Sequence, residues 1–344
     1  MSAHAVSPEI SVVVVNWNRR ELLRVCLESL ARQRGADFEV IVVDNGSSDG
    51  SAEMARAEFG ARVIANQENR GFCAANNQGF AVASGRFIAL LNNDAEAEPF
   101  FLGELRRAFD AASDIGMAAA KVLVYEDPRR IDKAGHLIYP DGQNRGRGTG
   151  EIDEGQYDAV EECLWPDGCA AMYRKSMLDA IGGFDEDLFM FGDDAELGLR
   201  ARIAGWRCLY MPGAVVRHHR GGSLSASSTR RIFLIERNRV LLAAKLFPWS
   251  LVAVNWYYFG LRLAGGLLAA AGGTGEMARF PGWAGKLRLA WTIIRADLAA
   301  LALLPRMLRK RRAVRRIAKL APAEVRRLIL RHRIPVRALV EQSN

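Results

Sequence analysis

Two acidic residues lie at or near the ends of apolar runs in the first hundred residues of the chain. Asp44 follows the run 38–43, and Asp94 follows the run 87–91 after two asparagines. Where such runs are parallel strands, their ends open on a crevice in which α/β sheets bind ligands. One carboxylate there can accept hydrogen bonds from a base or a ribose, and the other can hold a divalent metal that binds a diphosphate. The alternative role for each acid is a capping turn.

A second acidic group stands at the start of a predicted helix over about 194–204. Asp193, Asp194 and Glu196 follow an aromatic loop and fall in or beside the first turn of that helix. The helix N-terminus favours ionised carboxylates, whereas crowding by like charges opposes ionisation. Three acids in four positions exceed what a helix cap requires, so we expect a functional carboxylate here.

Two adjacent histidines, His218 and His219, end a predicted strand and precede a Gly-Gly-Ser loop at 221–223. A neutral imidazole can complete the coordination of a metal, and a glycine loop can approach a phosphate closely. A structural role is the alternative for either histidine. GxGxxG does not follow the first strand and GxxxxGK[ST] does not occur, so these two nucleotide-binding loops are disfavoured.

Apolar runs and amphipathic segments alternate over the first 95 residues. The predicted strands are 10–15, 38–43, 62–65 and 87–91. Helical periodicity over 22–30 and 72–84 separates them. This alternation predicts a doubly wound α/β sheet whose working edge lies at the strand C-termini. Further along, the glycine-rich polar segment 140–158 predicts a mobile loop, and 207–211 and 215–216 predict strands.

The positive charge of the chain belongs to its last hundred residues. The formal net charge is +8, but residues 1–245 carry a net −6 and residues 246–344 a net +14. The acidic body argues against a nucleic-acid-binding core. A length of 344 residues suits one large α/β domain with an appendage, so we place the domains at 1–245 and 246–344.

The C-terminal region begins with two apolar stretches. The first, 250–272, is about long enough to cross a bilayer, but Asn255 and Arg262 interrupt it. The second, 289–304, is shorter and also carries a charge pair. Because charged groups are costly in the middle of a bilayer, a simple lipid-exposed span is disfavoured.

A strongly basic segment, 306–319, follows these stretches and holds eight basic residues among fourteen. Its apolar stripe consists of Met307, Val314, Ile317 and Ala321. The pattern is typical of a cationic helix lying on an anionic membrane face. The alternative is a solvated basic helix packed on the body. We expect contact with an anionic membrane surface through 250–320.

The cysteines and the N-terminus indicate the compartment. The five cysteines are widely spaced and form no CxxC pair, and residues 1–9 carry no secretory pattern. These features predict reduced thiols and a cytoplasmic body. With the basic tail, they predict a peripheral protein on the inner face of the cell membrane.

Seven segments together resemble the family 2 inverting glycosyltransferases, in particular the bacterial rhamnosyltransferase-like branch. The segments are 12–18, 43–50, 68–72, 77–79, 91–94, 183–200 and 237–239. They cover roughly residues 8–245 in the expected order. The resemblance implies a GT-A fold, a mixed doubly wound α/β sheet with a nucleotide-binding half followed by an acceptor-binding half.

The resemblance also implies a role for each candidate residue. The donor-binding residues that it implies are Asn16, Asp44, Arg70, Asn77, Asn93 and Asp94. The acceptor-side residues that it implies are Trp165, Asp167 and Asp193. Asp94 and His218 would hold Mg²⁺ or Mn²⁺, and Asp194 would act as the general base.

These roles predict the transfer of a sugar, with rhamnose as the candidate, from a nucleoside-diphosphate sugar. The acceptor would be a hydroxyl of a glycan or of a lipid-linked molecule, and one displacement would invert the anomeric carbon. Two other hypotheses remain open. A sugar-1-phosphate nucleotidyltransferase normally has a glycine-rich phosphate loop after the first strand, where this chain has Asn16-Trp17-Asn18. A membrane-tethered, non-catalytic scaffold would use the basic tail alone.

Overall fold

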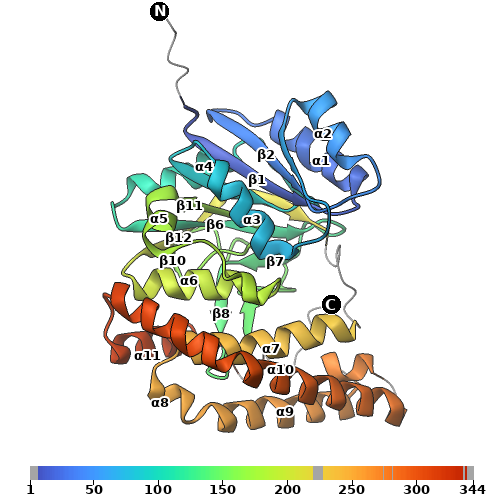
Figure 1. Ribbon diagram of the computed structural model, residues 1–344, viewed down its shortest axis with the longest axis vertical. Helices are drawn as coiled ribbons and strands as arrows, with labels where there is room; N and C mark the ends of the chain where they lie inside the picture. Colours follow the sequence, from blue (N-terminus) through green and yellow to red (C-terminus); the bar gives the residue numbers. More distant parts are fainter. Residues whose placement is uncertain (1–6, 220–227, 274, 281, 336–337, 339–344) are drawn as a thin grey trace, which may run out of the picture.

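A mixed β-sheet runs through the body of the protein, and a group of helices lies beneath it (Figure 1). The computed structural model describes residues 7–219, 228–273, 275–280, 282–335 and 338. Within these residues, ten strands form one sheet in the order β10-β12-β6-β11-β4-β1-β2-β3, with β5 paired to β12 and β7 paired to β6. A separate two-stranded sheet joins β8 and β9.

The first four strands are parallel and confirm the strands predicted from the sequence. They are β1 (Ile10–Asn16), β2 (Phe38–Asp44), β3 (Arg62–Ala65) and β4 (Phe87–Leu91). β1 pairs with β2 on one side and with β4 on the other, and helices cover both faces of the sheet, so the side chains on both faces of β1 are buried. A strand in this position is apolar throughout, which explains the run of valines in β1.

The second half of the sheet mixes strand directions. Its strands are β5 (Ala95–Ala97), β6 (Ile115–Val124), β7 (Ile131–Ala134), β10 (Glu161–Cys163), β11 (Ala170–Arg174) and β12 (Arg207–His218). β11 runs antiparallel to both β4 and β6, and β12 runs parallel to β6. The two strands predicted at 207–211 and 215–216 are one strand, whose register shifts between Met211 and Val215.

The segment predicted as a mobile loop, 140–158, contains the turn and the second strand of a hairpin. β8 (His136–Ile138) pairs with β9 (Asn144–Gly146), and the backbone of Gly150 donates to the carbonyl of Ile131 in β7 at 2.9 Å. The prediction was wrong because main-chain hydrogen bonds organise this segment, and these leave no apolar period in the sequence.

Helices cover both faces of the sheet. They are α1 (Arg20–Ala31), α2 (Ser51–Phe59), α3 (Gly71–Val82), α4 (Phe101–Arg107), α5 (Lys175–Ile181) and α6 (Asp193–Ile203), with 3₁₀ turns η1 (Ala108–Asp110) and η2 (Glu186–Leu188). Val12 and Val14 of β1 pack in the core beneath α1, α2 and α4, and Val13 packs in the core beneath α3, α5 and α6.

Two glycines allow helices to approach the sheet closely. A Cβ at Gly79 of α3 would lie 2.4 Å from Val13 of β1. A Cβ at Gly198 of α6 would lie 2.2 Å from Trp165, which precedes β11. Because neither contact leaves room for a side chain, these glycines fix the positions of α3 and α6 against the sheet.

The C-terminal helices pack against the body below α6 (Figure 1). They are α7 (Thr229–Leu246), α8 (Trp249–Val252), α9 (Asn255–Ala271), α10 (Gly282–Ile317) and α11 (Pro322–Arg331), with the 3₁₀ turn η3 (Glu276–Arg279) before α10. α10 lies along α7, across the predicted boundary at 245/246. The division into two domains therefore stays a prediction.

The apolar stripe of the basic segment faces the protein. The second apolar stretch and the basic segment form one helix, α10, with Pro305 inside it. Met307 and Val314 are buried in the main core, so the prediction that they lie on a membrane was wrong. Ile317 is half-buried, and Ala321, beyond the end of α10, is exposed. A stripe at helical spacing looks the same whether it packs on a bilayer or on another helix. Here it packs on the body, as the alternative held.

The arginine that interrupts the first apolar stretch connects α9 to the body. Arg262 pairs with Asp141 at 2.6 Å and with Glu236 of α7 at 2.7 Å, and both acids are buried. None of the described helices has the combination of length and apolar character needed to cross a membrane.

Candidate active site

A cavity of about 1070 Å³ opens at the C-terminal edge of β1 and β4 and extends down to α7, α9 and α10. Most of the candidates lie in its wall, although the chain separates them widely. The predicted residues that line it are Asn93, Asp94, Asp167, Asp193, Asp194 and His218. The metal candidates and the proposed base therefore share one cavity.

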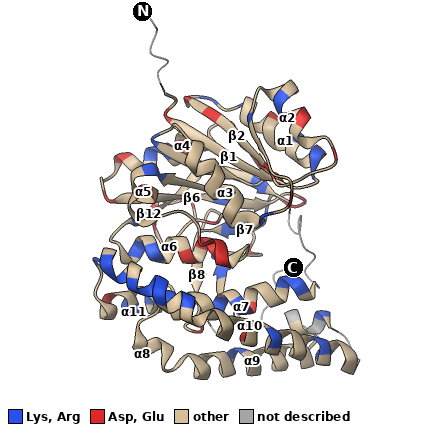
Figure 2. Ribbon diagram, viewed as in Figure 1, with Lys and Arg blue, Asp and Glu red and all other residues tan. Residues whose placement is uncertain are grey.

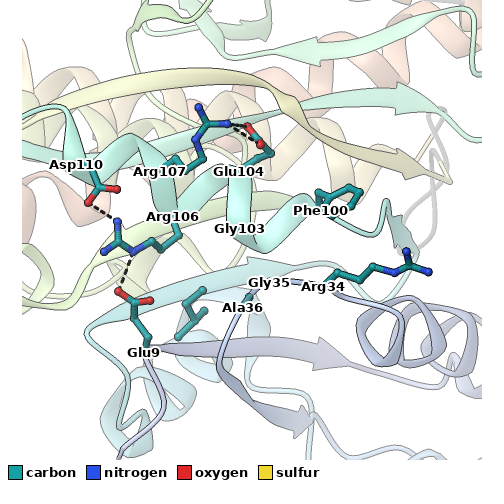
Figure 3. A pocket seen from close by; sticks show the side chains of 11 residues that line it. Glu9, Arg34, Gly35, Ala36, Phe100, Gly103, Glu104, Arg106, Arg107 and Asp110 are labelled. Carbon is teal, nitrogen blue, oxygen red and sulfur yellow. Dashed lines mark hydrogen bonds and ion pairs between the residues drawn. The ribbon is translucent and has the colours of Figure 1, made fainter.

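A smaller cavity of about 350 Å³ lies near the start of β1, between α4 and the turn after α1 (Figure 3). Five of its charged groups are paired with one another. Arg106 pairs with Glu9 at 2.8 Å and with Asp110, and Arg107 pairs with Glu104 at 2.8 Å. It contains none of the predicted site residues, so it is not the candidate site.

A network of hydrogen-bonded polar side chains lies at the end of the large cavity where the donor is predicted to bind. Asn16 donates from Nδ2 to Asp44 Oδ2 at 3.2 Å, and Asn93 donates from Nδ2 to Asn16 Oδ1 at 2.7 Å. Asp44 Oδ1 accepts from the backbone of Ser47 at 2.9 Å. Asn16 and Asp44 lie behind the lining and Asn93 is part of it. Contact between Asp44 and a nucleoside stays a prediction.

Two other donor-side candidates lie outside the lining. The Asn77 amide donates to the carbonyl of Phe184 at 2.9 Å and accepts from its N–H at 2.8 Å, so it ties α3 to the loop before η2. This structural use replaces the predicted donor contact of Asn77. Arg70 is exposed at the start of α3, between two lining residues, Asn69 and Gly71. A donor contact of Arg70 stays a prediction.

Asp94 and His218 meet because the strands that carry them are paired. His218 in β12 lies opposite Ala95 in β5, and the backbone of His219 donates to the carbonyl of Asp94 at 2.9 Å. The His218 Nε2 atom lies 3.3 Å from Asp94 Oδ1. Within the described residues, Asp94 Oδ1 is buried and has no hydrogen-bond partner.

Asp132 of β7 fixes the orientation of His218, and sequence reasoning missed it. Its Oδ2 lies 2.9 Å from His218 Nδ1, which leaves Nε2 directed at Asp94. A carboxylate on the far nitrogen is the usual support of a metal-binding histidine. The Asp94 oxygen without a hydrogen bond and the oriented imidazole therefore fit a divalent metal, which Asp94 and His218 would hold.

The electrostatics at His218 also favour a positive charge. Burial opposes the charged imidazole, but Cys169 and the Asp132 and Asp94 carboxylates raise the pKa of His218 well above its usual range. A group that holds a proton this strongly lies where the surroundings favour a cation. A divalent metal satisfies the same requirement by displacing the proton.

Asp193 and Asp194 stand next to each other at the start of α6, where acidic residues gather (Figure 2). Burial and the neighbouring Asp194 raise the pKa of Asp193 to about 8, so Asp193 is mostly protonated at neutral pH. Burial also raises the pKa of Asp194, but His136 opposes that rise. Asp194 Oδ1 accepts from the backbone of Ala195 at 2.7 Å, which leaves Oδ2 for chemistry.

Two further residues beside Asp194, Lys133 and His136, were not found from the sequence. Lys133 Nζ lies 2.6 Å from Asp167 Oδ2, and His136 Nε2 lies 2.8 Å from the same oxygen. Although burial opposes ionisation, Lys133 and His136 hold the pKa of Asp167 well below its usual range. Each is a single polar residue on a short strand, and only the pairing of those strands shows its importance.

His136, Asp167 and Asp194 also have the spacing of a metal cluster, with one ligand atom from each within 4.8 Å of the others. The ammonium group of Lys133 already supplies a positive charge to Asp167. A second cation at this point would meet that charge, which favours Asp94 and His218 as the metal position; this position stays a prediction.

Trp165 does not face the cavity. It is fully buried under Gly198, and its ring lies 6.1 Å from that of His136 at 27°. The predicted acceptor contact of Trp165 was wrong, because the ring fills the space between α6 and β8.

His219 pairs with Glu126 at 3.0 Å. The predicted phosphate-binding loop at 221–223 lies outside the described residues.

The comparisons with known proteins agree with this geometry. The sequence profile described as Glycosyl transferase family 2 matches residues 11–182, half of the chain. The chain belongs to glycosyltransferase family 2. The matched residues include Asn93, Asp94 and Asp167 of the cavity lining and end before Asp193, Asp194 and His218.

Relatives of this glycosyltransferase include bacterial enzymes. The N-acetylglucosaminyl-diphospho-decaprenol L-rhamnosyltransferase of Mycobacterium tuberculosis is 24% identical over 273 residues, 72% of this chain and 88% of the relative. The putative glycosyltransferase EpsH of Bacillus subtilis is 34% identical over 177 residues, 51% of this chain and 49% of EpsH. The resemblance inferred from the sequence is thereby confirmed.

A solved structure confirms the GT-A-type fold. GalNAc-T7 with UDP, GalNAc and Mn²⁺ matches with a TM-score of 0.59 at 15% identity, over 75% of this chain and 51% of that chain. This glycosyltransferase thus spans about half the length of EpsH and of GalNAc-T7.

Proposed function

We propose that this glycosyltransferase moves a sugar from a nucleoside-diphosphate sugar to a hydroxyl acceptor with inversion of the anomeric carbon. The observation that carries the proposal is that the pair Asp94 and His218 and the carboxylate of Asp194 line the same cavity. Asp94 and His218 would hold a cation, and Asp194 Oδ2, which lies 3.4 Å from His136 Nε2, faces the same cavity. A single displacement needs both of these groups.

The residues of the chain suggest how the transfer proceeds. Asn93, held by Asn16 and Asp44, would orient the donor beside Asp94. A bound Mg²⁺ or Mn²⁺ would neutralise charge on the departing nucleoside diphosphate. Asp194 would take the proton of the acceptor hydroxyl as its oxygen bonds to the anomeric carbon and the bond to the diphosphate breaks. The crystal structure of GalNAc-T7 contains Mn²⁺ together with UDP, which supports this choice of metal.

The identity of the donor and the acceptor rests on separate observations. The name of the Mycobacterium tuberculosis relative supports rhamnose as the sugar and a lipid-linked acceptor. Beyond Asp194 the cavity continues between α7, α9 and α10, where its lining includes Leu263, Leu289 and Ile293. An apolar extension next to the base would accommodate the lipid part of an acceptor, and a glycan acceptor would use its polar walls.

We also propose that the protein is peripheral on the inner face of the cell membrane, with 250–320 in contact with anionic lipid. An apolar set on α9 and the N-terminal half of α10 supports this proposal. Its members are Trp256, Tyr257, Leu267, Leu268, Trp283, Leu287, Trp291, Leu298 and Leu301, each more than half exposed. So many exposed large apolar side chains are typical of an interaction surface. Lys and Arg line the C-terminal half of α10 beside it (Figure 2).

Product analysis of the full-length protein tests the reaction. We expect nucleotide-sugars to raise the melting temperature more with Mn²⁺ or Mg²⁺ than without, and turnover to release a nucleoside diphosphate. Release of pyrophosphate from a nucleoside triphosphate would favour the nucleotidyltransferase instead. A protein that binds anionic vesicles but no nucleotide-sugar would favour the scaffold.

A further inference from the structure

We propose that His136 is a positioning residue that orients the Asp194 carboxylate and keeps it ready to accept a proton. The proposal rests on the proposed function, because it assumes that Asp194 is the base. It assigns to the three paired side chains of Lys133, Asp167 and His136 a role in the chemical step in addition to their packing. Three separate segments, β7, β8 and the loop between β10 and β11, deliver these side chains to the start of α6.

The geometry places one N–H between two carboxylates. His136 Nε2 lies 2.8 Å from Asp167 Oδ2 and 3.4 Å from Asp194 Oδ2. The other oxygen of Asp194 already accepts from the backbone of Ala195, so Oδ2 is the oxygen available to an acceptor hydroxyl. His136 is thus the side chain that faces the reactive oxygen, and Asp167 holds the imidazole in that position.

The second ring nitrogen shows that His136 is not placed to maximise hydrogen bonding. Its Nδ1 atom is buried and, within the described residues, has no hydrogen-bond partner. A purely structural buried histidine normally satisfies both nitrogens. Here Trp165 lies on one side of the ring, and Nε2 bonds to Asp167 at 2.8 Å while it lies 3.4 Å from Asp194 Oδ2.

The charges around Asp194 explain why such a residue is needed. The charged and titratable groups that face Asp194 are Asp193 on α6, Asp167, Tyr173 on β11, Lys133 and His136. Burial raises the pKa of Asp194, and Asp167 raises it further. His136 opposes this rise more than Lys133 does, whose ammonium is paired with Asp167. Without His136, we expect the pKa of Asp194 to rise further, because burial and Asp167 would then be opposed by Lys133 alone.

The test compares the pH profile of kcat for the wild type with those of two variants, His136→Leu and His136→Gln. Leucine removes the donor and keeps an apolar contact with Trp165, whereas the glutamine amide can still donate. For His136→Leu we expect kcat at pH 7 to fall roughly tenfold and the acidic limb to move up by about one pH unit, with recovery at high pH. The pH profile of His136→Gln should lie between those of His136→Leu and the wild type.

A binding measurement and a matched histidine variant separate the possible causes of a loss in kcat. Donor affinity, measured by calorimetry with the nucleoside diphosphate and Mn²⁺, should stay within about twofold in both variants, since a factor of two is under 0.5 kcal/mol. His332→Gln, at the end of α11 and outside the cavity lining, is the matched control. It keeps the backbone hydrogen bond from Ile138 of β8 to the His332 carbonyl and should leave the profile unchanged.

Two results would overturn the inference. One is a wild-type profile in both variants, and the other is an equal loss of kcat at every pH, which a merely structural role would give. If Asp194→Asn keeps full turnover, the proposed function itself fails, and the inference about His136 fails with it. Inactive Asp194→Asn with an unshifted His136→Leu profile would refute the inference alone.

Discussion

Exchanging each acid at the start of α6 for its amide separates the base from its neighbour. Asp193 and Asp194 are adjacent, and both line the cavity. Burial and Asp194 raise the pKa of Asp193 to about 8. At pH 7 only about one tenth of Asp193 is ionised, so Asp193→Asn replaces one neutral group by another. Asp194→Asn instead removes the proton acceptor.

The two variants are expected to lose very different amounts of kcat. Loss of a general base lowers turnover by ~10²–10⁴, which corresponds to roughly 3–5 kcal/mol in the barrier. We therefore expect Asp194→Asn to lose at least ~10² in kcat at pH 7. Asp193→Asn should lose less than about tenfold, or roughly 1.4 kcal/mol, because the wild-type side chain is already mostly uncharged.

Release of nucleoside diphosphate at saturating donor, acceptor and Mn²⁺ measures kcat, and calorimetry measures donor affinity. Donor affinity should be nearly unchanged in both variants, since Asp94 and His218 remain intact. Equal losses in the two variants, or near-normal turnover in Asp194→Asn, would refute the assignment of the base.

Three further predictions follow from the fold. Asp132→Asn should weaken Mn²⁺ binding about 10–100-fold, measured by titrating the metal-dependent rise in melting temperature, and an unchanged affinity would remove its role in orienting the histidine. Gly198→Ala should destabilise the protein by about 1–3 kcal/mol in a denaturant titration, because its Cβ would lie 2.2 Å from Trp165. Burial opposes ionisation of Asp185, but Lys245 and a second lysine lower its pKa to about 2. A depressed folded pKa gives stabilisation that is present above about pH 4 and lost as the pH falls toward 2, so Lys245→Met should flatten the melting temperature across that window.

The sequence predicted the parts of the site that depend on regular periodicity. The apolar runs that become β1 to β4 fix where Asp44 and Asp94 stand, and the acids that begin α6 are visible as a cluster. Asp132, Lys133 and His136 escaped notice for a physical reason. They lie on β7 and β8, short strands in a segment whose order comes from main-chain pairing with β6 and β9.

The C-terminal region shows a second limit of periodicity. The stripe containing Met307 and Val314 was assigned to a membrane, yet it is buried against the body. Arg262 was interpreted only as an interruption, but its partners Asp141 and Glu236 lie on distant segments and form a buried ion pair with it. A one-dimensional pattern identifies an amphipathic helix but does not identify what covers its apolar side.

The central claim is that the cation site and the base lie in one cavity and serve one displacement. A crystal of the full-length protein grown with Mn²⁺ and a nucleoside diphosphate tests it most directly through the anomalous signal of manganese. We predict one manganese peak bonded to Asp94 Oδ1 and His218 Nε2, with the diphosphate on the metal and Asp194 Oδ2 facing the remaining space. A manganese peak among His136, Asp167 and Asp194, or a diphosphate bound outside this cavity, would contradict it.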